Sequence, residues 1–118
     1  MGKIKKMNRH FFYDDFSDRL TISCKKPSDK IAGSVRVLNV VFDFTTDMKI
    51  ANVEIRGVSK YLSSLNINPN ILNNLIDAEI VFKSYRNGYL IYFILKTKQK
   101  IERIPFNIPM NKPIPIIT

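Results

Sequence analysis

Three aspartates stand close together in the stretch YDDFSDRLTIS, residues 13–23. Carboxylates at this spacing are candidates for an acid–base pair or a divalent-cation site. A catalytic pair must face one cleft, however, and adjacent aspartates on a tight turn point apart. A calcium loop needs ligands at alternate positions and a central glycine, which this stretch lacks. Aspartate side chains commonly accept hydrogen bonds from turn amides, so we interpret Asp14, Asp15 and Asp18 as structural residues of a turn between two strands.

Two further aspartates, Asp43 and Asp47, are candidates to complete a two-metal site, but no histidine lies among them. His10 is the only histidine, so a histidine triad, a histidine zinc site or a histidine acid–base pair would have to use it. We interpret His10 as a surface or half-buried imidazole at a strand start. Asp43 and Asp47 are likewise assigned to turn structure, and we expect no catalytic residue, no metal and no cofactor.

Other chemistries lack the residues that they require. The sequence has four glycines and neither a GxGxxG nor a GxxxxGK[ST] motif, which argues against a phosphate-cradling nucleotide fold. Cys24 is the only cysteine, so no internal disulfide forms and a reducing compartment is expected. No signal-peptide pattern and no run of about 18 apolar residues occurs, so we expect a cytoplasmic protein with no membrane partner. If a pocket exists, Glu54 and Lys60 are its most plausible polar pair.

The excess of basic residues is the main feature of the composition: 19 lysines and arginines against 10 aspartates and glutamates give a formal net charge of +9. Such an excess attracts nucleic acid and anionic surfaces, although charge alone gives no sequence readout. Tyrosines beside cations in the second half of the chain are typical of sheets that stack single-stranded bases. The alternative for Tyr92 is interior packing, because YLIYFIL is apolar on both faces, and no RNP-like motif occurs. The candidate nucleic-acid-binding residues are Lys83, Tyr85, Arg86, Tyr89, Lys96, Lys98, Lys100 and Arg103.

The first half of the chain has the two-residue periodicity of strands. We predict strands at residues 9–14 and 19–24, where Leu20 and Ile22 share one face. The run SVRVLNVVFDF predicts one long central strand with a bulge near Asn39, and residues 50–56 predict a returning strand after the turn TTDMK.

The periodicity then changes to that of helices and returns to that of strands. Residues 58–65 have apolar side chains at helical spacing, and a second short helix is predicted to begin at Pro69 after an Asn68 cap. Two strands around RNG follow, and then an edge strand, because Pro105 cannot donate to a central ladder.

These elements predict a single α+β domain: an antiparallel β-meander sheet of about six or seven strands, with a helix pair inserted between two meanders. The apolar, proline-rich tail is expected to pack against a groove on its own domain or on a second copy. The predicted segments are a basic arm at 1–8, a first β-meander at 9–56, the helix pair at 57–77, a second β-meander at 78–106 and a Pro/Ile tail at 107–118.

The stretch YDDFSDRLTIS followed by VVFDFTTDMKIANVEIRGVSKYL resembles the family known as domain of unknown function 2283, over about residues 11–65. Two features depart from the family pattern: Met48 stands where a glycine is usual, and the family's acidic character is replaced by a basic one. The resemblance implies a fold and no activity, and some members resemble predicted antitoxin partners. The matching positions are Tyr13, Asp14, Asp18, Leu20, Ile22, Asp43, Asp47, Val53, Glu54, Ile55, Ser59 and Lys60.

The sequence therefore favours a non-enzymatic binding module for an anionic partner, either nucleic acid or a ribonucleoprotein. The first alternative is a protein-interaction module, a homodimer or an antitoxin-like partner. The second is a small enzyme with an unrecognised carboxylate site.

Overall fold

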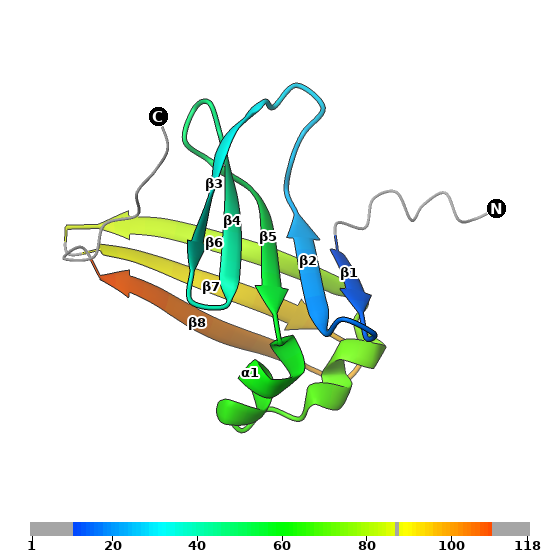
Figure 1. Cartoon of the computed structure of the whole chain (residues 1–118). Coiled ribbons are helices and arrows are strands. Elements are labelled where there is room, and N and C mark those ends of the chain that lie inside the picture. Colours follow the sequence, from blue (N-terminus) through cyan, green and yellow to red (C-terminus); the bar gives the residue numbers. More distant parts are fainter. Residues whose placement is uncertain (1–10, 87, 110–118) are drawn as a thin grey trace.

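The computed structural model describes residues 11–86 and 88–109 of the 118-residue chain. These residues form eight strands in two antiparallel sheets, one α-helix and one 3-10 helix (Figure 1). The α+β class is confirmed, whereas the single sheet of six or seven strands is wrong. The strands are β1 (Phe11–Asp14), β2 (Arg19–Ser23), β3 (Ile31–Val37), β4 (Val40–Thr45), β5 (Ile50–Arg56), β6 (Asp77–Tyr85), β7 (Gly88–Lys96) and β8 (Ile101–Pro109), and the helices are α1 (Val58–Ser64) and η2 (Pro69–Asn74).

The first sheet has five strands in the order β1-β2-β5-β4-β3. It is not the continuous meander that the sequence predicts, because β2 pairs with β5 and the chain crosses to the far edge before β3. The register places Leu20 opposite Ile55 and Ile22 opposite Val53. All four side chains are buried, so the shared apolar face explains why β2 pairs with β5.

The predicted long strand with a bulge near Asn39 is in fact a hairpin of β3 and β4. Val37 pairs with Val40, and the chain reverses at Leu38 and Asn39. Leu38 has φ 55°, a left-handed conformation that leucine rarely adopts. Hydrogen bonds hold this turn against β5: the Arg56 amide donates to the Asn39 carbonyl at 2.8 Å, and Asn39 Nδ2 donates to the Arg56 carbonyl at 2.9 Å. No glycine marks the turn, which is why the apolar pattern conceals it.

The second sheet is a three-stranded meander in the order β6-β7-β8, with β8 at an edge. Pro105 lies in that edge strand opposite Tyr92. The strand continues to Pro109, so the first three residues of the predicted tail, 107–109, belong to β8. The rest of the tail and its predicted docking lie outside the described residues, as does the basic arm.

The two helical segments close one end of the molecule (Figure 1). Helix α1 follows Gly57, whose φ of 63° suits glycine, and buries Val58 and Leu62. The predicted second short helix is a 3-10 helix. It begins as expected: Pro69 is its first residue, and the Asn68 side chain accepts from the Asn70 amide at 2.9 Å. Six residues allow only a short turn of this kind.

The core lies between the two sheets, whose strands cross one another in Figure 1. Three phenylalanines join the layers: the Phe106 ring lies 5.9 Å from the rings of both Phe42 and Phe93, measured between centroids. Phe42 and Phe93 are fully buried, and each such side chain contributes roughly 1.5–3 kcal/mol through removal from water. No helix in the described part of the chain is long and apolar enough to span a membrane.

Candidate nucleic-acid interface

The sequence-predicted nucleic-acid residues are split between two ends of the three-stranded sheet. Lys83 and Arg86 lie at the β6–β7 end, where Lys83 pairs with Leu90. Lys96 and Lys98 lie at the far end of β7 or beyond it. The stretch of β7 from Leu90 to Lys96 spans about 20 Å. The structure therefore does not bring the predicted residues into one site, and the side chains of Tyr85 and Tyr89 lie outside its described part.

Two of the four cations toward the far end, Lys96 and Lys100, are balanced by acidic neighbours. Lys96 Nζ lies 2.9 Å from Glu79 Oε2 and 4.0 Å from Asp77 Oδ2. The hydrogen bond and charge of Glu79 raise the pKa of Lys96. Lys100 Nζ lies 3.4 Å from a Glu102 oxygen. Lys98 and Arg103 are exposed and form no ion pair within the described residues, which leaves them as the free cations of this end.

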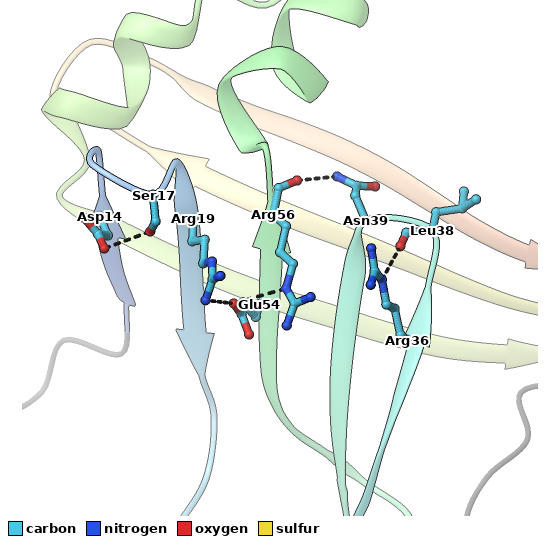
Figure 2. A network of polar contacts seen from close by, with 8 residues as sticks. All are labelled: Asp14, Ser17, Arg19, Arg36, Leu38, Asn39, Glu54 and Arg56. Carbon is cyan, nitrogen blue, oxygen red and sulfur yellow. Dashed lines mark hydrogen bonds and ion pairs between the residues drawn. The ribbon is translucent and has the colours of Figure 1, made fainter.

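A second group of cations lies on the outward face of the five-stranded sheet, drawn in Figure 2. Leu20 and Ile55 point inward, so the neighbouring residues Arg19, Glu54 and Arg56 point outward. Arg19 lies opposite Arg56 in the register. We call Arg19, Arg36, Glu54 and Arg56 the arginine face.

The register also places Arg36 on this face. Val41 pairs with Glu54 on one side and with Arg36 on the other. Arg36 is therefore two strands from Glu54, about 10 Å across the sheet. The arginine face thus draws side chains from β2, β3 and β5.

One carboxylate serves two guanidinium groups on the arginine face. Glu54 Oε2 lies 3.0 Å from Arg19 Nη1 and 3.4 Å from Arg56 Nε. Arg36 Nε donates to the Leu38 carbonyl at 3.0 Å and forms no ion pair among the described residues. Three positive charges with one negative charge leave this group at +2. The arginine side chains of the Glu54 pairs are 49% and 40% exposed, so the guanidinium groups reach solvent.

An exposed aromatic ring stands in the same cross-strand row. Phe12 lies opposite Thr21, which lies opposite Glu54. Phe11 and Tyr13 pack against the core, and Phe12, between them, is 66% exposed. Phe16, in the β1–β2 turn, is 96% exposed. Neither ring is among the residues predicted from the sequence, although the alternation in residues 11–13 signals the outward position of Phe12.

Lysines gather at one end of the same sheet. They come from the β2–β3 connection and the β4–β5 turn. A hydrogen bond of 3.0 Å from the Thr46 amide to the Lys30 carbonyl joins these two loops. Strand β1 begins at this end, because Phe11 pairs with Ile22 near the end of β2. We call Lys25, Lys26, Lys30 and Lys49 the lysine loops.

The terminal segments supply much of the charge. Residues 11–86 and 88–109 contain 14 basic and 10 acidic residues, so they account for +4 of the net charge of +9. Residues 1–10, which precede β1, contain four basic residues and no acidic one. These four are Lys3, Lys5, Lys6 and Arg9, and Lys112 supplies the remaining charge.

Asp14 acts within its own turn. Its carboxylate accepts from the Phe16 amide at 3.0 Å and from Ser17 Oγ at 2.8 Å. The hydrogen bond from Ser17 lowers the pKa of Asp14. Asp15 is exposed in the same turn. This geometry is the turn chemistry that the residue types suggest, and it leaves Asp14 committed to local contacts.

Asp18 connects the turn to α1. Its carboxylate accepts from Ser59 Oγ at 2.8 Å, from the Ser59 amide at 3.1 Å and from the Tyr13 hydroxyl at 2.9 Å. Burial tends to raise the pKa of Asp18, but the hydrogen bonds from Ser59 and Tyr13 outweigh it and lower that pKa. Burial, followed by the contact with Asp18, raises the pKa of Tyr13 to about 12. Asp18 therefore caps the start of a helix whose own cap position is Gly57.

The assignment of Asp43 to a turn is wrong. Asp43 lies within β4, and its carboxylate accepts from Ser34 Oγ and Asn52 Nδ2 on the neighbouring strands. Asp47 does lie in the β4–β5 turn, where a hydrogen bond with Thr45 lowers its pKa. Among the described residues, no group of three or more histidine, cysteine, aspartate or glutamate residues is placed to hold a metal ion.

Two other candidate chemistries receive no support from the geometry. Glu54 pairs with arginines rather than with Lys60, which is exposed on α1. Cys24 is exposed, but desolvation of its thiol raises the pKa and disfavours the thiolate that a nucleophile needs.

A pocket of about 160 Å³ lies between η2 and the β7–β8 connection. Two of its lining groups are already bonded within the chain, since Thr97 Oγ1 and the Asn70 carbonyl accept hydrogen bonds from neighbouring residues.

No protein-family model, no curated protein and no solved structure matches the chain. The resemblance to domain of unknown function 2283 therefore stays a prediction.

Proposed function

We propose that the protein is a non-enzymatic binding module for an anionic polymer, single-stranded nucleic acid, which lies across the arginine face. The observation that carries this proposal is the charge imbalance there: Arg19 and Arg56 share the carboxylate of Glu54, and Arg36 on a third strand has no carboxylate partner among the described residues. Guanidinium groups bind phosphate through paired hydrogen bonds. Their exposed N–H groups are free to do so without breaking the Glu54 contacts.

Phe12 and the lysine loops extend this surface in two directions. An exposed ring on a sheet stacks on a base, which contributes roughly 1–3 kcal/mol in single-strand binding proteins. Phe12 has the exposure for this role and lies in the row of Glu54 and Arg36. The lysine loops and the basic residues of segment 1–10 add long-range attraction that salt screens.

The carboxylates support a binding role over catalysis. Asp14, Asp18 and Asp43 each accept hydrogen bonds that hold structure, and Glu54 is shared by two arginines. With this function we also propose that the protein is cytoplasmic and that its partner is a nucleic acid, free or in a ribonucleoprotein.

The test is a titration of the full chain into fluorescein-labelled single-stranded oligouridine of about twelve nucleotides, followed by anisotropy at several salt concentrations. Arg36→Glu should weaken binding about tenfold or more, because it reverses an unpaired charge on the surface. Phe12→Ala should weaken oligouridine binding but leave heparin binding unchanged, because heparin has no bases to stack. Lys98→Glu is the matched control: it is an equal charge reversal at an exposed site in the β7–β8 connection, away from the five-stranded sheet.

Equal losses from Arg36→Glu and Lys98→Glu would show attraction by overall charge with no site on the arginine face. A loss from Lys98→Glu alone would return the site to the residues predicted from sequence. Absence of binding at low salt would end the nucleic-acid proposal.

A further inference from the structure

The outward face of the three-stranded sheet has an apolar centre, and the charged residues Glu79, Lys83, Lys96 and Arg103 lie on the same face around it. Leu90, Tyr92 and Ile94 alternate along β7 with residues that point into the core. Val81 lies on one side of Tyr92 and Pro105 on the other, so a cross-strand row runs over the middle of the sheet. We call Val81, Leu90, Tyr92, Ile94, Ile101 and Pro105 the apolar face.

These side chains do not belong to the core between the sheets. The alternate residues of β7, Ile91, Phe93 and Leu95, are at most 1% exposed and fill that core. Members of the apolar face retain contact with solvent, and Ile101 is 63% exposed. A strand that is apolar on both faces is typical of a sheet covered on both sides.

The two outward faces of the molecule differ in character. The outward positions of β2 and β5 are polar, with Thr21 opposite Glu54 and Ser23 opposite Asn52. An antiparallel sheet that faces water normally has such residues. The apolar patch at the centre of the other sheet, which Arg103 borders beside Ile94, instead marks a surface that another molecule covers.

One pair of charges on this face, Lys83 and Glu79, is complementary under a two-fold rotation. Lys83 and Glu79 lie on β6, each two residues from Val81, and both share its outward side. Consider a two-fold axis that lies between the two copies, perpendicular to the strands and along the row of Val81, Tyr92 and Pro105. Rotation about this axis places the row of Lys83 in one copy over the row of Glu79 in the other. In two copies packed face to face, Lys83 of each copy therefore lies against Glu79 of the other.

The same rotation matches the apolar residues. Leu90 of one copy meets Ile94 of the other, and Tyr92 meets itself on the axis. A self-complementary patch of this kind is what an isologous dimer requires. Aromatic residues at the centre with charged pairs around them are the usual anatomy of an interface.

We propose that a second copy of this chain covers the apolar face, forming a homodimer with Tyr92 on its two-fold axis and two Lys83–Glu79 contacts. The arginine face lies on the opposite sheet, so the dimer presents two arginine faces to solvent. A polymer that binds one face can then engage the second at a raised effective concentration. The proposed dimer is tested separately from nucleic-acid binding, because its experiment measures only the mass of the protein in solution.

The experiment is sedimentation velocity of the full chain over a range of concentrations. The wild type should sediment as a dimer. Lys83→Glu and Glu79→Lys should each weaken self-association about tenfold, because each places like charges together twice. An equal mixture of the two variants should restore dimers, since both contacts of the heterodimer then join a glutamate to a lysine. Lys60→Glu, an exposed charge reversal on α1, should leave the dimer unchanged.

Glu79 also pairs with Lys96 in its own chain, so thermal melting should confirm that Glu79→Lys is folded. Tyr92→Lys gives a second, independent variant: it places two positive charges on the axis and should weaken the dimer on the order of a hundredfold. A wild type that stays monomeric at all concentrations would overturn the proposal, whether the face is open or residues 110–118 cover it. A dimer indifferent to Lys83→Glu and Tyr92→Lys would also overturn it, because another surface would then hold the copies together.

Discussion

At the scale of single residues, Asp18 does more than its place in the sequence suggests. The types and spacing of residues 13–18 are sufficient to predict a turn, and Asp14 bonds to Phe16 and Ser17 within it. The partner of Asp18, however, is Ser59, which is 41 residues away. No local pattern reveals such a contact, because it depends on how β5 and α1 return to the first hairpin.

We expect Asp18→Asn to cost about 1 kcal/mol of folding free energy, or roughly 3–5 °C in melting temperature, because the amide nitrogen cannot accept from Ser59 or Tyr13. Asparagine tolerates the left-handed φ of 55° at this position, so the change removes the charge and an acceptor oxygen of the carboxylate without straining the backbone. Asp14→Asn, whose contacts are exposed, is the control and should cost less. Equal decreases in the melting temperatures of the two variants would contradict a special role for Asp18.

The same substitution predicts a pH dependence. The pKa of Asp18 is lower in the folded protein than its ordinary value near 4. The carboxylate therefore stabilises the fold above that ordinary pKa, and the contribution disappears as pH falls through the lower, folded-state value. Urea denaturation should show a constant gap between wild type and Asp18→Asn from about pH 6 to 7 that closes in acid. A gap that widens in acid would have the wrong sign for this account.

At the scale of elements, the sequence predicts strand positions better than their partners. The alternation of Leu20 and Ile22 and the edge position of Pro105 follow from local physics, and the structure has both. The β3–β4 turn is not predicted from the sequence, because Leu38 has a left-handed conformation in which glycine or asparagine is usual. The division into two sheets escapes as well, since one sheet and two stacked sheets share the same two-residue periodicity.

The ring of Phe93 tests how strongly the two sheets depend on each other. It is fully buried and lies 5.9 Å from the Phe106 ring. We expect Phe93→Ala to cost about 3–5 kcal/mol, because a buried ring leaves a cavity. Phe12→Ala removes the same atoms from a 66% exposed position on the outward face and should stay within about 0.5 kcal/mol. Denaturant titrations of both variants check this, and similar costs would mean that Phe12 is not free on the surface.

At the scale of the whole molecule, the fold separates functions that the sequence places together. The cations predicted around the β6–β7 hairpin fall at opposite ends of one sheet, and Lys96 is balanced by Glu79. Composition reveals a basic protein but not which face carries free charge. That face depends on the register, which brings Arg19 opposite Arg56 and leaves Glu54 between two guanidinium groups. The apolar face shows the same limit: YLIYFIL signals burial on both sides, but not what covers the second side.

The arginine face is tested most directly by nuclear magnetic resonance of the isotope-labelled full chain, titrated with unlabelled oligouridine. We predict that amide shifts change most at Phe12, Arg19 and Arg36, with smaller changes along the lysine loops. The amides of Lys98, in the β7–β8 connection, and of Arg103, in β8, should stay near their free positions. Shift changes confined to the three-stranded sheet, or none at low salt, would contradict a nucleic-acid interface on the five-stranded sheet.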